Sequence, residues 1–86
     1  MASLREKFGN RLKSIRLSRK MSQEQFAELL DISVDFLSLI ERGINAPSFE
    51  NLDVFAVQLG IPVADLFTFD ARAASDESRQ VLPELG

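Results

Sequence analysis

The 86-residue sequence contains no cysteine, histidine, tryptophan or tyrosine. Without cysteine, the chain can form neither a disulfide framework nor a thiolate metal site, so packing alone must hold its fold, as suits a reducing compartment. Without histidine, it lacks the usual general base, the commonest zinc ligand and every nucleophile–base pair built on imidazole. The remaining serine, lysine and carboxylate side chains show no acid–base constellation. We therefore predict a protein that is not an enzyme and that needs no metal or cofactor.

Long apolar runs are also missing. No stretch approaches the roughly 20 apolar residues that span a bilayer, and residues 1–20 lack the apolar centre of a signal peptide. We expect a soluble, cytoplasmic protein with no membrane partner. With 45% apolar residues, a chain of this length can build one compact core. That size leaves no room for a ligand-sensing domain, so no small-molecule ligand is expected.

Charge is unevenly distributed along the chain. Residues 1–20 contain seven basic side chains and one carboxylate, whereas residues 21–86 contain three arginines and twelve carboxylates. The net charge of −3 therefore conceals a basic segment on an acidic body. Such a segment can attract a polyanion, and the alternative is a solvated basic helix face. The candidates for long-range attraction are Arg11, Lys13, Arg19 and Lys20.

Apolar residues recur at spacings of three and four, and no stretch alternates over the length of a strand, so the sequence predicts an all-α fold. Leu4, Phe8, Leu12 and Ile15 indicate an amphipathic first helix over residues 4–19. The basic residues lie between these apolar positions. The first helix therefore holds most of the positive charge.

The stretch Ser22–Gln25 has the form of a capping box, and it starts a second helix that Asp31 ends in a left-handed conformation. Ser33 offers a further N-cap only two residues later, for a third helix that ends near Arg42. Two helices joined by so short a turn cannot lie antiparallel and must cross steeply. This crossing is the geometry of a helix-turn-helix.

Gly43 closes the third helix, Ser48 caps a fourth, and Gly60 ends it. Pro62 starts a short fifth helix through Phe67, which gives five helices in one domain over residues 4–69. The apolar face of the fourth helix comprises Phe49, Leu52, Phe55, Ala56 and Leu59. The aromatic residues expected in the core are Phe8, Phe26, Phe49 and Phe55. After residue 69 the composition changes to alanine, serine and charge, which predicts a tail over residues 70–86 that is disordered or bound to a partner.

Several fragments of the chain keep an order and spacing that few folds share. They are Arg16, Ser22-Gln23-Glu24-Gln25-Phe26-Ala27, Leu37-Ser38, Ile40-Glu41-Arg42-Gly43, Pro47-Ser48, Leu59-Gly60 and Asp65-Leu66-Phe67. Together, over about residues 8–67, they resemble the Cro and phage-repressor type of helix-turn-helix domain, the XRE family of bacterial regulators. The resemblance implies a compact, lambda-repressor-like all-α domain of five helices. It also implies that Arg16 and Glu41 form a structural ion pair between the first helix and the third.

The resemblance further implies that the partner is double-stranded DNA, with the third helix in the major groove, which is roughly 12 Å wide. The residues expected to meet base edges are Ser33, Val34, Asp35, Ser38 and Leu39. The groups expected to meet phosphates are Gln23 and the amides of the Ser22-capped helix start on one side, and Arg42 and the backbone amides near Asn45 on the other. Val34 suits a thymine methyl group, and Asp35 suits the amino group of cytosine. For Asp35 a structural alternative stays open, because a carboxylate at the second helical position is stabilised by the helix dipole.

The fourth and fifth helices carry more apolar residues than one buried face requires. The surplus predicts a homodimer interface made by Val54, Val57, Ile61, Phe67 and Phe69, with Val63 nearby. A symmetric dimer also suits a palindromic operator, since one such domain grips only half of it. We expect a dimeric repressor or small controller protein. The alternative is a protein-interaction module of the same fold, antitoxin-like or antirepressor-like, that reads DNA weakly.

Overall fold

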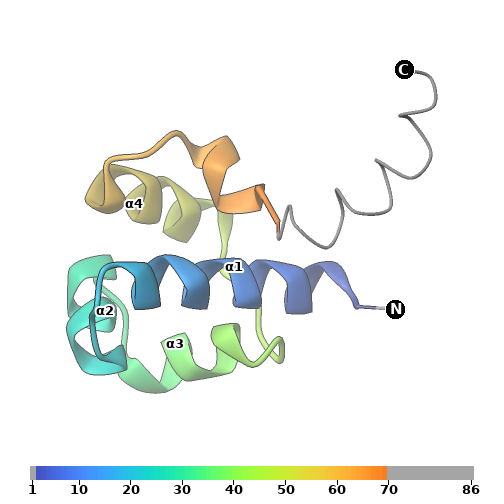
Figure 1. The fold of residues 1–86 in the computed structure, drawn as a ribbon, viewed down its shortest axis with the longest axis horizontal. Coiled ribbons are helices and arrows are strands. Elements are labelled where there is room, and N and C mark those ends of the chain that lie inside the picture. Colours follow the sequence, from blue (N-terminus) through green and yellow to red (C-terminus); the bar gives the residue numbers. More distant parts are fainter. Residues whose placement is uncertain (1, 70–86) are drawn as a thin grey trace.

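The structure, a computed structural model, describes residues 2–69. Four α-helices and one 3-10 helix make up this part of the chain (Figure 1): α1 (Leu4–Ser18), α2 (Gln23–Leu30), α3 (Val34–Glu41), α4 (Phe49–Leu59) and η1 (Val63–Phe67). The all-α prediction is confirmed. The fifth helix is of the 3-10 type, because the amide of Asp65 bonds to the carbonyl of Pro62, three residues before it, and the helix is only five residues long. The tail predicted over residues 70–86 lies outside the described residues.

Local side-chain chemistry starts and ends the helices as predicted. Ser22 caps α2, with its hydroxyl accepting from the amide of Gln25 while the Gln25 side chain accepts from the amide of Ser22. The hydroxyl of Ser33 accepts from the amide of Phe36 and starts α3. Between these helices Asp31 takes the left-handed conformation, with φ 63° and ψ 42°. That one residue reverses the chain sharply enough for α2 and α3 to cross.

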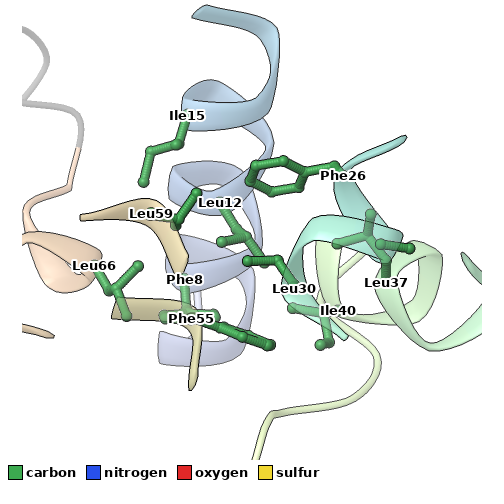
Figure 2. Close-up of a cluster of buried hydrophobic side chains, with 11 residues drawn as sticks. Phe8, Leu12, Ile15, Phe26, Leu30, Leu37, Ile40, Phe55, Leu59 and Leu66 are labelled. Atoms are coloured by element: carbon green, nitrogen blue, oxygen red, sulfur yellow. The ribbon is translucent and has the colours of Figure 1, made fainter. Parts of the chain in front are cut away.

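One apolar core joins all five elements (Figure 2). Its buried members are Phe8, Leu12, Ile15, Phe26, Ala27, Leu30, Leu37, Ile40, Phe55, Leu59 and Leu66. α1 packs on α3 and η1, α2 packs on α3 and α4, and α4 packs on η1. In Figure 1, α1 therefore lies in the middle, with α4 on one side of it and α3 on the other. No helix in the described part is long and apolar enough to cross a membrane.

Two residues predicted to be apolar contacts are exposed. The prediction was wrong for Leu4, which is 61% exposed, and for Phe49, which is 84% exposed. Each is the first residue of its helix, and the buried residues of α1 and α4 begin at Phe8 and Phe55. Helical periodicity identifies the side of a helix that faces the core, but it does not show how far along the helix the core extends.

Candidate nucleic-acid interface

The outer face of α3 carries only part of the predicted base-reading set, because Val34 packs against the core. Leu37, Ile40 and Glu41 are buried against the body, and helical spacing places Asp35 and Leu39 on the opposite face. Asp35 is exposed, whereas Val34, Ser38 and Leu39 are half-buried. Figure 1 shows α3 along one edge of the molecule, on the side of α1 away from α4. The only described helices that pack extensively on α3 are α1 and α2, so this outer face is open.

The beginnings of α2 and α3 both present backbone donors. The first amides of a helix lack intrahelical partners. In α2 the amide of Gln25 is satisfied by Ser22, which leaves the amides of Gln23 and Glu24 without an acceptor among the described residues. Ser33 is exposed, and its hydroxyl is engaged as the cap of α3. The positive end of the helix dipole adds to the attraction that such amides exert on an anion.

A buried polar network fixes the first residue of α2 to the end of α3. Arg16 donates to both oxygens of Glu41, from Nε to Oε2 at 2.8 Å and from Nη2 to Oε1 at 3.1 Å. The side chains of Arg16 and Glu41 are only 11% and 3% exposed. Arg16 also donates from Nη1 to the backbone carbonyl of Met21 at 3.0 Å. The structure thus brings the two residues of the predicted ion pair together, between α1 and α3.

Gln23 belongs to the same network, which the sequence reasoning missed. Its Nε2 donates to Oε1 of Glu41 at 3.0 Å, so the carboxamide is held against the body. An amide nitrogen carries two hydrogens, and one remains for another acceptor. No local pattern signals this contact, since the partner lies 18 residues away in the chain.

The loop after α3 contains the remaining phosphate candidates. Arg42 ends α3 and is exposed, and Gly43 turns the chain with φ 77°. The backbone amides of Ile44 and Asn45 both donate to the carbonyl of Leu39, at 2.9 and 3.2 Å. The amide of Asn45 is therefore already engaged, and its exposed side chain is the part of this residue that is open to a ligand.

Two of the four basic residues considered for long-range attraction point toward α4 and η1. Arg11 donates from Nε to the carbonyl of Asp65 at 2.8 Å, and Arg19 donates from Nη2 to the carbonyl of Leu59 at 2.8 Å. These bonds direct both guanidinium groups to the side of α1 away from α3. Lys13 and Lys20 are exposed. Part of the positive charge of residues 1–20 therefore binds backbone carbonyls of the same domain.

The predicted dimer residues lie on α4, η1 and the adjoining segments. Val57 is 75% exposed, Val54 and Phe67 are each 38% exposed, and Ile61 and Phe69 are half-buried. The ring of Phe67 lies 5.2 Å from that of Phe8 and 6.2 Å from that of Phe69, measured between centroids. Together these exposed and half-buried residues make up the apolar patch of α4, η1 and the adjoining segments. In the described part of the chain, no group of three carboxylates is placed to hold a metal ion.

Comparison with known proteins agrees with this geometry. The helix-turn-helix family HTH_3 matches residues 12–66. The control protein C.MunI of a Mycoplasma species is 36% identical over 69 residues, which cover 79% of this chain and 93% of that protein. The immunity repressor of Bacillus phage phi105 is 43% identical over 56 residues, 65% of this chain and 39% of the repressor. The solved structure of the restriction-modification controller protein C.AhdI from Aeromonas hydrophila has a TM-score of 0.69 at 33% identity, over 73% of this chain and 96% of its own.

The family match spans more than half of the chain, and it includes both crossed helices and the polar network between them. The resemblance that the sequence predicted is therefore confirmed. This chain belongs to the HTH_3 helix-turn-helix family and is a DNA-binding transcriptional regulator of the Cro and phage-repressor type.

Proposed function

We propose that this protein acts as a homodimeric repressor or small controller protein that reads a palindromic operator through the major groove. The observation that carries the proposal is the open outer face of α3, flanked by the amide-rich start of α2 and by the exposed Arg42. Control and repressor proteins among the relatives favour a controller or repressor role. The proposed site of action is the cytoplasm, where bacterial DNA lies.

In this proposal α3 reads bases and its flanks hold phosphates. Ser33, Val34, Asp35, Ser38 and Leu39 meet base edges. On one side of the groove, the amides at the Ser22-capped start of α2 and the second N–H of Gln23 bind one phosphate. On the other side, the Arg42 guanidinium and the Asn45 side chain bind another. Phosphate contacts set the register, and base contacts select the sequence.

The apolar patch on α4 and η1 is proposed to join two copies of the chain. Val57, with three quarters of its surface exposed, lies at the most exposed point of the patch. A twofold axis through this patch leaves α3 outermost in each copy, because α1 separates α3 from α4 (Figure 1). Two such helices can then enter successive major grooves, which lie about 34–36 Å apart on one side of B-DNA.

Selection of bound sequences from a random duplex library tests the proposal. We expect enrichment of a palindrome whose half-sites lie one helical turn apart, and binding that weakens steeply with salt as counterions are released. In the Arg42→Ala variant the salt slope should fall by about one unit per half-site. A library from which no sequence is enriched, with binding insensitive to salt, would favour the protein-interaction module and contradict the proposal.

A further inference from the structure

α4 and η1 are attached to the rest of the domain by three side-chain hydrogen bonds in addition to apolar packing. Arg11 on α1 and Arg19, the residue that caps the C-terminal end of α1, reach the carbonyls of Asp65 in η1 and Leu59 at the end of α4, each at 2.8 Å. Gln58 on α4 donates from Nε2 to the carbonyl of Leu29 in α2 at 3.0 Å. Leu59 and Leu29 are in the last turns of their helices. Carbonyls there lack intrahelical partners and carry partial negative charge, so donors bind them favourably.

These three bonds are placed so that they restrain orientation. Arg11 and Arg19 are eight residues apart, about 12 Å along a helix axis, and the third bond ends on α2. Apolar burial is non-directional and tolerates small rotations, whereas hydrogen bonds weaken steeply when their angles depart from the preferred range. Attachment at two points on α1 and a third on a different helix therefore limits both tilt and twist of α4 and η1 against α1, α2 and α3.

In the proposed dimer this orientation determines where the two recognition helices lie. α4 and η1 face the twofold axis, and α3 lies on the far side of α1 (Figure 1). Two successive helix-packing distances of 8–10 Å give a lever of about 18 Å. A tilt of about 10° across that lever moves α3 by about 3 Å, close to the rise of one base pair in B-DNA, about 3.4 Å.

We infer that Arg11, Arg19 and Gln58 are positioning residues that make the dimer selective for one spacing between operator half-sites. The inference rests on the proposed function, since it requires a dimer formed through α4 and η1. None of the three side chains needs to touch DNA in this role. Their contribution is the choice among operators with the same half-site sequence and different separations.

The test uses the full chain and duplexes that carry the selected half-sites with separations from two base pairs shorter to two longer than the selected one. For the wild type we expect affinity to fall at least about tenfold, or about 1.4 kcal/mol, for a change of one base pair. Gln58→Met removes a donor without changing charge, and it should reduce that difference to about threefold or less. Arg11→Gln and Arg19→Gln should act in the same direction. Lys13→Gln removes the same charge from an exposed position on α1 and should keep the wild-type dependence on spacing.

Two further measurements show whether a change in spacing dependence comes from altered orientation, from weaker half-site binding or from loss of folding. Binding to an isolated half-site should be equal in Gln58→Met and wild type, and equal in Arg11→Gln and Lys13→Gln. Melting curves confirm that each variant is folded. Variants that retain the wild-type dependence on spacing would overturn this inference and leave the proposed dimer intact. A wild type that binds all separations equally would overturn both the proposed function and the inference.

Discussion

Glu41 is the acceptor through which α1, α2 and α3 are joined by side-chain hydrogen bonds. Its carboxylate accepts two bonds from Arg16 on α1 and one from Gln23 on α2, while Glu41 itself belongs to α3. With 3% of its side chain exposed, its charge depends on these donors in place of water. The same carboxylate therefore supports the fold and orients a side chain proposed to hold a phosphate.

Replacing Glu41 with alanine should destabilise the protein strongly, because Arg16 would keep a nearly buried charge without its partner. Breaking a buried pair in this way costs about 3 kcal/mol. In a domain of this size the melting temperature should fall by about 12 °C or more. Thermal unfolding followed by circular dichroism measures it. Glu28→Ala, which removes an exposed carboxylate of α2, should change the melting temperature little, and equal values for Glu41→Ala and wild type would show that the pair does not stabilise the fold.

Asp35 is exposed in the first turn of α3, where its carboxylate either reads a base or stabilises the start of the helix. If it accepts from a cytosine amino group, Asp35→Ala should relax selectivity at one base pair per half-site, at a cost of about 1–3 kcal/mol. Affinity measured on the selected operator and on single-base-pair variants decides the matter. A uniform rise in affinity for every duplex would mean instead that Asp35 only repels phosphates and stabilises the helix.

The candidate interface was predictable from the sequence only in part. Ser33 was predictable as the cap of α3, whereas Asp35, Ser38 and Leu39 were assigned to base edges by the family resemblance and stay a prediction. The contact between Gln23 and Glu41 was not predictable, because it depends on how two helices are placed in space. The same reason applies to Arg11 and Arg19, whose acceptors are backbone carbonyls 54 and 40 residues away. Every residue has a carbonyl, so no residue type marks such an acceptor.

At the scale of elements, α1 approaches α3 so closely that one position admits only glycine. A Cβ added at Gly9 would lie 2.2 Å from the backbone oxygen of Ile40 and 2.9 Å from that of Glu41. Gly9 is buried, and it belongs to the same contact between α1 and α3 as the Arg16–Glu41 pair. This close approach fixes the inner side of α3 against α1 and leaves the outer face of α3 open.

Gly9→Ala should therefore destabilise the protein although alanine is the better helix former. Alanine gains about 1 kcal/mol in helix propensity, whereas a clash with two backbone oxygens costs at least about 1–3 kcal/mol, and backbone atoms cannot rotate away. Urea denaturation measures the net change in the free energy of unfolding. Asn10→Ala, at the next and exposed position of α1, should be neutral or slightly stabilising. A Gly9→Ala protein more stable than wild type would contradict the packing described here.

Helix boundaries were predictable where local chemistry sets them. The caps Ser22, Ser33 and Ser48 and the left-handed positions Asp31 and Gly60 act on amides and carbonyls within a few residues. The extent of the core along each helix was not predictable from the sequence, because it depends on where neighbouring elements end. Leu4 and Phe49 fit the periodicity of their helices and still lie outside the core.

At the scale of the whole molecule, the described domain presents two different faces on opposite sides of α1 (Figure 1). The α3 side carries the exposed Asp35 and Arg42 beside the half-buried Leu39, and the α4 side carries the exposed apolar residues Val57 and Phe67. A protein that must pair with itself and bind DNA at once needs two such separate surfaces. The arrangement suits the proposed dimer, in which the α3 helices of both copies remain accessible.

Val57→Glu should convert the proposed dimer to monomers, because a charge would be buried at the centre of the proposed interface. Binding to the full operator should weaken far more than binding to a single half-site. Analytical ultracentrifugation at micromolar concentration reports the oligomeric state. Leu17→Glu introduces the same charge at a 55% exposed residue of α1 and should leave the dimer intact. A wild-type protein that stays monomeric, with or without DNA, would contradict dimerisation.

Methylation protection tests most directly whether α3 enters the major groove. Dimethyl sulfate modifies guanine at N7, which lies in the major groove, and adenine at N3, which lies in the minor groove. On the selected operator we predict protection of guanine N7 in two clusters centred one helical turn apart, with adenine N3 still reactive. Protection of adenine N3 alone, or no protection at saturating protein, would contradict the account.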